Sequence, residues 1–432
     1  MATWRNWAGN QTATPARVIS PRGTAEVVSA VHRAAAAGLT VKAAGTGHSF
    51  TGIAATDGVQ LLPHRMGRIR SVDADARRVT VEAGMPLCDF NQAIATLDLA
   101  LANMGDIAVQ TVAGATATGT HGTGRDSAGI SPQIAGLELV TADGSVLTCS
   151  ATENPDLFAA ARISLGALGI VTAVTFAVEP AFRLHAVEKP MRWAEVLGDL
   201  DGLTSRNEHF EFYWFPHTEH CLTKQNNRTD GPARPLSRLR GWWEDEFVSN
   251  TVFGAYNRLA RRAPRLIRRG NRLAGVLLSA RDYVDAAHRV FASPRRVRFI
   301  ECEYAVPRES VPEVLRELRR TIESSDWRIS FPIEVRFAPA DNLWLSTGSG
   351  RPTAYVAIHQ FIGSRGLDGY FPTAERIFCA ASGRPHWGKL HTRGPEYLAA
   401  AYPRYADFVT LRDKLDPQRR FTNPYLTQIL GD

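Results

Sequence analysis

The stretch Leu39-Thr-Val-Lys-Ala-Ala-Gly45-Thr-Gly-His-Ser-Phe50 runs an apolar strand straight into a glycine-rich loop. Clustered glycines let backbone N–H groups come close to a phosphate, because no side chain stands in the way. The loop lacks the GK[ST] ending of a Walker A motif, and Phe50 stands where a GxGxxG fingerprint needs its third glycine. It is not a GxSxG nucleophile elbow, since Thr51 follows Phe50. Taken alone, the loop is either a phosphate cradle or a plain turn between strands.

Val112–Gly124 is a second glycine-rich stretch, crowded with alanine and threonine. Its small, hydroxylated side chains offer many hydrogen bonds and little bulk, which suits a long polar ligand with phosphates and ribityl hydroxyls. The alternative is a Gly/Thr loop of no special role. Two such loops within the first 180 residues favour a dinucleotide-like cofactor.

Strands and helices alternate up to Pro180, with a strong hairpin signal at Asp143-Gly144. Beyond Pro180 the pattern changes. It predicts strands at 209–215, 298–305, 328–337 and 353–362 and helices at 310–323 and 370–381. This order predicts a first domain over 1–180 and a second α+β domain with one antiparallel sheet over 181–415. The second domain is expected to carry a basic, helical insertion at about 217–297, and a tail over 416–432 follows it.

Polar residues of the second domain fall on shared strand faces. Glu334 and Arg336 stand two apart on a predicted strand, so their side chains point the same way, as do His359 and Phe361. The loop Arg384-Pro-His-Trp-Gly-Lys389 adds an imidazole and an ammonium group. Such groups around one pocket would bind a polyhydroxylated substrate and manage a proton and an anion. The alternative for Glu334 and Arg336 is a solvated cross-strand ion pair.

The composition is that of an ordinary globular chain, with 432 residues, 44% hydrophobic and 22% charged. No run of about 18 apolar residues and no apolar N-terminal region is present, so we expect a cytoplasmic protein without a spanning helix or signal peptide. Five scattered cysteines without a CxxC pair argue against a disulfide framework. His217-Thr-Glu-His220 lacks the HExxH spacing of a zincin, so no metal site is expected.

The excess positive charge is local. The formal charge is +7 at pH 7, and the arginines cluster at positions 258, 261, 262, 265, 268, 269 and 272, followed by 295, 296 and 298. No aromatic platform of the RNP type and no zinc finger accompanies them, so we expect no nucleic-acid partner. A solvated face is the expected role of the basic helices at 252–272, with peripheral membrane contact as the alternative.

These segments together resemble the FAD-dependent aldonolactone oxidoreductases of the vanillyl-alcohol-oxidase type, which have a PCMH-type FAD domain. Gly45–Phe50 is similar to the pyrophosphate loop of the family, and Asn103–Asp106 with Ala113–Gly124 is similar to the stretch along the flavin. The rest of the resemblance lies in Glu334-Val-Arg336, His386-Trp-Gly-Lys389 and Leu415–Tyr425. Within the family, the chain resembles actinobacterial L-gulono-1,4-lactone dehydrogenases and, next to them, bacterial alditol oxidases.

The resemblance implies an α+β fold of two domains, with FAD bound by residues 1–180, substrate bound by 181–415, and the tail 416–432 returning to the FAD domain. It also implies a covalent bond between His48 and the flavin 8α carbon. The residues implied to bind the cofactor are Ala44, Gly45, Thr46, Gly47, His48, Ser49, Gly105, Gly114, Thr118, Gly119, His121, Gly122, Ile170 and Asn423.

By the same resemblance, hydride passes from the carbinol carbon of an aldono-1,4-lactone to flavin N5. The implied catalytic residues are Glu334, which takes the hydroxyl proton, and Arg336 and Lys389, which face the substrate and the reduced flavin. The implied substrate-binding residues are Asp106, His359, Phe361 and His386.

Three positions bear on specificity. Gly105 corresponds to a small residue that gates oxygen in the family, and glycine there admits oxygen. Asp106 stands where alditol oxidases carry serine, which favours a lactone, and Phe361 replaces a hydroxyl side chain, so the pocket should be less polar. The expected electron acceptor is oxygen or a redox protein. The alternatives are an alditol or carbohydrate oxidase, a tailoring oxidase for a natural product, and a flavin-binding protein without catalysis.

Overall fold

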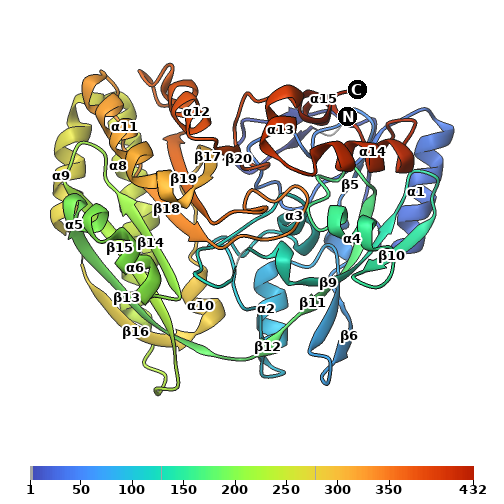
Figure 1. The fold of residues 1–432 in the computed structure, drawn as a ribbon, viewed down its shortest axis with the longest axis horizontal. Helices are drawn as coiled ribbons and strands as arrows, with labels where there is room; N and C mark the ends of the chain where they lie inside the picture. The colour runs from blue at the N-terminus through green and yellow to red at the C-terminus, as the bar shows by residue number, and fades with distance from the viewer. Residues whose placement is uncertain (1–2, 128, 278) are drawn as a thin grey trace.

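The computed structural model describes residues 3–127, 129–277 and 279–432, and two α+β domains lie side by side in it (Figure 1). A small parallel sheet opens the first domain, in the order β3 (Arg17–Ile19), β5 (Val59–Leu61) and β4 (Val41–Ala43). Helix α1 (Thr24–Ala36) packs its apolar face on this sheet through Val27, Ala30 and Val31. Burial of that face fixes β4, and β4 leads directly into the glycine loop.

A five-stranded antiparallel sheet forms the rest of the first domain. Its order is β10 (Val146–Ser150), β9 (Ile134–Val140), β11 (Ile170–Ala177), β7 (Arg78–Glu82) and β6 (Ile69–Asp73). The expected hairpin at Asp143-Gly144 joins β9 to β10. Helices α2 (Leu87–Ala95), α3 (Val112–Ala117) and α4 (Pro155–Ala161) contribute to the same hydrophobic core.

The second domain is built on an eight-stranded sheet in which every pairing is antiparallel. Its order is β16 (Arg281–Ala286), β13 (Arg183–Arg192), β15 (His220–Thr229), β14 (His209–Trp214), β18 (Ile333–Ala338), β19 (Thr353–Phe361), β17 (Phe299–Pro307) and β20 (Arg384–Pro385). Helices α5 (Trp193–Gly198), α6 (Leu200–Arg206), α11 (Val311–Ser324) and α12 (Tyr370–Ala380) bury their apolar faces in the core beside it.

Two local expectations differ from the structure. The 217–297 insertion is not wholly helical, because β15 and β16 lie within it and join the sheet. The polar sequence of β15 hides this, since the strand is specified by pairing with β13 and β14 along its length. Likewise Val112–Gly124 is not all loop. It begins as α3, whose first turn is capped by the Thr111 hydroxyl accepting from Gly114 N–H at 3.3 Å.

Helices occupy the middle of the insertion. They are α7 (Arg238–Gly241), the π-helix η3 (Trp242–Val252), α8 (Phe253–Arg262), η4 (Pro264–Leu266) and α9 (Ile267–Leu277), with α10 (Ala287–Phe291) after β16. The remaining short elements are β1 (Trp4–Arg5), β2 (Thr12–Ala13), η1 (Pro63–Arg65), β8 (Leu99–Ala100), η2 (Ser131–Gln133), β12 (Glu179–Pro180) and η5 (Arg308–Ser310). Among the described residues, no helix has both the length and the apolar character needed to cross a bilayer.

The C-terminal helices α13 (Pro395–Ala401), α14 (Tyr405–Leu415) and α15 (Pro424–Leu430) lie beside the first domain (Figure 1). Leu398, Phe408 and Ile429 belong to the core of that domain. The chain therefore returns to the first domain before residue 416. Val41 N–H donates to Arg420 O at 2.8 Å, which ties the tail directly to β4.

Candidate active site

Two adjoining cavities form the centre of the site. The smaller, about 120 Å³, is lined by the loop Gly45–Ser49 together with residues of β4, α3 and β11. The larger, about 570 Å³, is lined by residues of both domains. Their walls share His48, Ser49, Gln110 and Thr118. A long ligand therefore meets a continuous wall from the glycine loop to the second domain.

Glycine is required at two positions of the loop. Gly47 has φ +72°, a backbone conformation in which other side chains are strained. A Cβ on Gly45 would lie 2.3 Å from the Thr111 hydroxyl oxygen, so only glycine allows the loop to approach α3 this closely. Trp7 N–H donates to Gly47 O at 2.8 Å and holds the loop in place. The result is a backbone cradle of the kind that suits an anionic group.

His48 lies where the two cavities meet. Its Nδ1 is 3.0 Å from Thr46 Oγ1, and its ring stacks on Trp7 with the centroids 5.4 Å apart. Burial, reinforced by the nearby charge of Lys389, lowers the pKa of His48 to about 4. The imidazole is therefore neutral at pH 7 and keeps a lone pair on one ring nitrogen.

Glu334 and Arg336 lie on β18, as their two-residue spacing predicts, and both line the larger cavity. They are buried, and Glu334 Oε1 is 2.5 Å from Arg336 Nη2, so the alternative of a solvated ion pair does not hold. β14 places Tyr213 opposite Glu334 and Glu211 opposite Arg336. The Tyr213 hydroxyl is 3.2 Å from Glu334 Oε1, and Arg336 Nε donates to Glu211 Oε2 at 2.8 Å.

Charges of opposite sign surround this pair. Arg336 Nη2 lies 3.4 Å from Asp106 Oδ1, and the other carboxylate oxygen of Asp106 is 2.9 Å from Arg295 Nη2. Glu211 is 3.5 Å from Lys224 Nζ. Sequence reasoning missed Glu211, Tyr213, Lys224 and Arg295. Two-residue spacing along the aromatic strand could have found the first two, whereas Lys224 and Arg295 come from the polar insertion and carry no comparable signal.

The neighbouring carboxyl groups have pKa values pushed in opposite directions. Burial raises the pKa of Glu334 to about 8. The attraction of Arg336 opposes this rise, and the repulsion of Asp106 and Glu211 adds to it. Burial alone would also raise the pKa of Asp106, but Arg336 and Arg295 hold it well below its usual range. Neighbouring acids with separated pKa values are the arrangement that acid–base chemistry requires. Glu334 is thus the group that can exchange a proton near neutral pH.

Lys389 supplies a cation on the same cavity wall. It forms an ion pair with Glu301, whose Oε1 lies 3.7 Å from His359 Nε2. Burial alone would lower the pKa of Lys389, but Glu301 and Glu303 raise it above its usual value, so the ammonium stays charged. Glu301 is a further residue that the sequence did not reveal. It stands opposite His359 in the pairing of β17 with β19.

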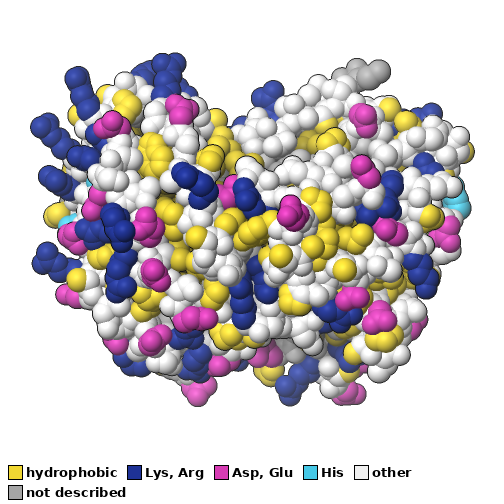
Figure 2. Space-filling model, turned by 45° about the horizontal axis from the view of Figure 1, so that its top comes forward, with side chains coloured by type: hydrophobic (Ala, Val, Ile, Leu, Met, Phe, Trp, Pro, Cys, Tyr) yellow, Lys and Arg dark blue, Asp and Glu magenta, His cyan; other side chains and the backbone are white. Residues whose placement is uncertain are grey.

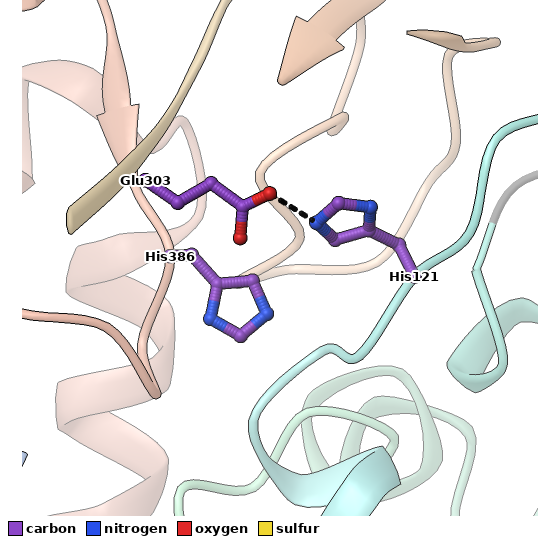
Figure 3. A group of neighbouring side chains, drawn as sticks. All are labelled: His121, Glu303 and His386. Carbon is purple, nitrogen blue, oxygen red and sulfur yellow. Dashed lines mark ion pairs between the residues drawn. The ribbon is translucent and has the colours of Figure 1, made fainter. Parts of the chain in front are cut away.

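His121, Glu303 and His386 form a buried group on the wall of the larger cavity (Figure 3). Their ligand atoms lie within 4.8 Å of one another, a spacing that could hold a metal ion. His121 Nε2 is instead 3.3 Å from Glu303 Oε1, and His386 Nδ1 accepts from Gly388 N–H at 3.0 Å. Burial would raise the pKa of Glu303, but His121 holds it well below its usual range. The protein itself satisfies these polar atoms, so no metal is needed to explain the group.

Most residues singled out in the sequence line the two cavities. The first cavity takes in Gly45, Thr46, Gly47, His48, Ser49, Gly114, Thr118 and Ile170, and the second adds Gly105, Asp106, His121, Glu334, Arg336, His359, His386 and Lys389. Ala44, Gly119, Gly122, Phe361 and Asn423 are not among the lining residues. Asn423 has another task, because its side-chain amide donates to the backbone oxygens of Gly52, Ile53 and Ala55 and thereby holds the tail in place.

Comparison with known proteins identifies the family. A family model described as D-arabinono-1,4-lactone oxidase matches residues 174–429, and one described as FAD binding domain matches residues 15–150. The chain is 40% identical over 430 residues to L-gulono-1,4-lactone dehydrogenase of Mycobacterium tuberculosis, with 99% of each chain covered. This chain belongs to the D-arabinono-1,4-lactone oxidase family. It is an FAD-dependent oxidoreductase.

Two further known proteins are similar to this chain, one in sequence and one in fold. Alditol oxidase of a Streptomyces species is 30% identical over 444 residues, with 98% of each chain covered. Cholesterol oxidase of Brevibacterium sterolicum shares the fold, with a TM-score of 0.83 and 17% identity over 99% of this chain and 96% of that one. The expected two-domain FAD-binding fold is therefore confirmed.

The described residues fit FAD. The glycine cradle suits the pyrophosphate, and the two adjoining cavities offer an elongated space from that cradle to the charged residues of β18. Gln110, which lines both cavities, has a buried side-chain oxygen with no hydrogen-bond partner among the described residues. A buried acceptor without a partner at this point indicates that a bound ligand donates a hydrogen bond to it. Gln110 is therefore a further cofactor-binding candidate that the sequence did not suggest.

Proposed function

We propose that the chain oxidises an aldono-1,4-lactone of the L-gulono or D-arabinono type at the carbinol carbon beside the lactone carbonyl. The observation that carries this proposal is the meeting of Glu334, Arg336 and Lys389 on one cavity that adjoins the His48 loop. Bound FAD would supply the acceptor for the hydride from that carbon. The names of the relatives support the lactone class.

Each charged residue has a distinct task in this proposal. Glu334, in its ionised form, accepts a hydrogen bond from the reacting hydroxyl and takes its proton. Arg336 keeps Glu334 in position through the 2.5 Å contact and holds positive charge beside the reacting centre. Lys389, anchored by Glu301, donates a hydrogen bond to a substrate oxygen. The buried setting strengthens these interactions because little water screens them.

His48 is proposed as the covalent anchor of FAD. The neutral imidazole at the junction of the two cavities supports this role, because a lone pair is needed to bond to carbon. Thr46, at 3.0 Å from Nδ1, orients the ring. The electron acceptor is proposed to be oxygen or a redox protein, and Gly105 on the wall of the larger cavity leaves that wall free of a side chain.

An alditol is the second candidate substrate, and the environment of Asp106 disfavours it. Both carboxylate oxygens of Asp106 are occupied, one by Arg336 and one by Arg295. A carboxylate held in this way offers little to the extra hydroxyls of an open-chain polyol. A lactone, with fewer hydroxyls and a carbonyl that accepts hydrogen bonds, suits the donors Arg336 and Lys389 on this wall better.

The test starts with purified protein, its absorption spectrum and acid precipitation. A yellow pellet is expected from the wild type and a colourless pellet over a yellow supernatant from His48→Ala. A panel of L-gulono-1,4-lactone, D-arabinono-1,4-lactone and polyols then identifies the substrate class from flavin bleaching without oxygen. Glu334→Gln should bleach about 100–1,000-fold more slowly with flavin still bound, whereas the exposed Glu309→Gln should match the wild type. Normal bleaching of Glu334→Gln would refute the assignment.

A further inference from the structure

The segment from Leu239 to Val276, called here the 239–276 surface, exposes an unusual amount of apolar side chain. Most of the exposed large hydrophobic residues of the described chain lie on it, namely Leu239, Trp242, Trp243, Val248, Val252, Leu259, Leu266, Leu273 and Val276. Leu239 is 76% exposed and Val276 is 70% exposed. These side chains lie in one segment of the chain, whose helices α8 and α9 are at an edge of the second domain (Figure 1), and they indicate a surface that something covers.

The helices of this surface leave leucines exposed although their inward side, with Ala260 and Ile267, also buries polar side chains. Their inward side is held by asparagines, with Asn257 Oδ1 accepting from Ser330 Oγ at 2.6 Å and Asn271 Nδ2 donating to Ile329 O at 2.8 Å. Their outward side carries Leu259 and Leu273. Helices of a globular protein normally bury the apolar face and expose the polar one. Leu259 is 54% exposed and Leu273 is 60% exposed, so both would bury further apolar area on contact with an apolar medium.

The same surface carries uncompensated positive charge. The arginines at 258, 261, 262, 265, 268, 269 and 272 are all exposed, and none forms an ion pair or a hydrogen bond with a residue that the structure describes. The acidic residues nearby are already neutralised, Asp245 by Arg281 and Glu246 by Arg296. Lys and Arg side chains gather at the edge of the molecule over α8 and α9, with apolar side chains between them (Figure 2).

We propose that the 239–276 surface docks on an anionic lipid bilayer. Its tryptophans, leucines and valines would enter the boundary between headgroups and acyl chains, and its arginines would pair with lipid phosphates. Val248, Val252 and Leu273 also line the larger cavity, so docking places the mouth of that cavity at the lipid surface. The proposal needs no assumption about substrate and stands apart from the proposed function.

Two other partners fit the surface less well. A second copy of the chain in a two-fold dimer would place this patch against itself, which brings the seven arginines of each copy together without acidic partners. Nucleic acid would satisfy the arginines but would leave the leucines and valines in water. Only an anionic lipid surface offers phosphates and an apolar layer at the same depth.

The test is flotation of the full-length, flavin-loaded protein with vesicles of phosphatidylcholine alone or with about 30% phosphatidylglycerol. Binding to the anionic vesicles is expected at about 0.1 M salt and release at about 1 M. Two variants should each lower the bound fraction by at least about tenfold. One is the triple variant Arg261→Gln/Arg265→Gln/Arg268→Gln, and the other is the double variant Leu259→Ser/Leu266→Ser. Flavin content and circular dichroism should match the wild type for both variants.

Matched controls lie on the first domain. Arg17→Gln/Arg22→Gln/Arg33→Gln removes three exposed arginines, and Val18→Ser/Val146→Ser removes two exposed hydrophobic side chains. Both controls should float like the wild type. Failure of the wild type to bind anionic vesicles would overturn the proposal, as would equal loss in the controls. A dimer in light scattering that the leucine variant dissolves, or binding to DNA without binding to vesicles, would assign the surface to those partners instead.

Discussion

The acid–base assignment predicts a pH profile that the charged neighbours of Glu334 control. Burial raises the pKa of Glu334 to about 8, so about one molecule in eleven carries the ionised, proton-accepting form at pH 7 and about one in a hundred at pH 6. Because the base must be ionised to act, kcat/KM should rise with pH, about tenfold from pH 6 to pH 7, and level off above pH 8.

Substitution of Asp106 tests the physical cause of this shift. Asp106 Oδ1 and Glu334 Oε1 lie 3.4 Å and 2.5 Å from the same Arg336 nitrogen, so the two oxygens are no more than about 6 Å apart. At an effective dielectric constant of about 20, repulsion over that distance is about 2–3 kcal/mol, or roughly two pKa units. Asp106→Asn removes the negative charge, makes Glu334 easier to ionise, and should move the midpoint of the profile at least about one unit toward lower pH.

The assay is kcat/KM for the best lactone between pH 5 and pH 10, with a dye as electron acceptor, for the wild type, Asp106→Asn and the exposed control Asp126→Asn. The control should superimpose on the wild type. Asp106→Asn also weakens the contacts that hold Arg336 and Arg295 in place, so its overall rate should fall, but the midpoint is a separate readout. A wild-type profile that is flat from pH 6 to pH 9, or a midpoint that Asp106→Asn leaves in place or moves upward, would refute the reasoning.

Three further substitutions have defined outcomes. Gly105→Ala puts a Cβ 3.0 Å from the backbone oxygen of His121, and oxygen consumption should fall by on the order of tenfold while dye reduction continues. Gly122→Ala puts a Cβ 2.0 Å from a backbone oxygen, so the protein should lose flavin and unfold at lower temperature, unlike Gly198→Ala, which meets no atom within 4 Å. Lys42→Met leaves two backbone oxygens of buried loops without their donor, and urea titration should show a loss of about 1–3 kcal/mol in the free energy of unfolding.

Some of the fold followed from local rules that act within a few residues. Asp143-Gly144 turns back between β9 and β10 because its backbone requirements are those of a tight hairpin. Glu334 and Arg336 share a face because side chains alternate along any strand. The glycines of the His48 loop predicted a close backbone approach, and the 2.3 Å clash of an added Cβ with Thr111 gives the reason.

Other parts of the site lay beyond such rules. Lys224 and Arg295 come from a polar insertion whose sequence suggested helices. Lys224 reaches the cavity because β15 pairs with β14, and Arg295 reaches it because the chain runs back to the cavity after β16. Glu301 and Glu303 stand on β17 without any motif around them. Glu301 meets Lys389 because the segment after β20 runs along β17, where Leu390 N–H donates to Glu301 O at 2.9 Å, and Glu303 meets His121 of the first domain.

The sequence by itself determined the family, the glycine cradle, the position of His48 and the identity of the charged residues on β18, because each depends on short spacing or on a recognisable motif. Tertiary structure decided which of those charges titrates. Glu334 and Asp106 are both carboxylic acids. Burial, which Arg336 only partly offsets, raises the pKa of Glu334, whereas Arg336 and Arg295 depress the pKa of Asp106. Burial and pairing across strands far apart in the chain are long-range properties, and no local pattern in the sequence encodes them.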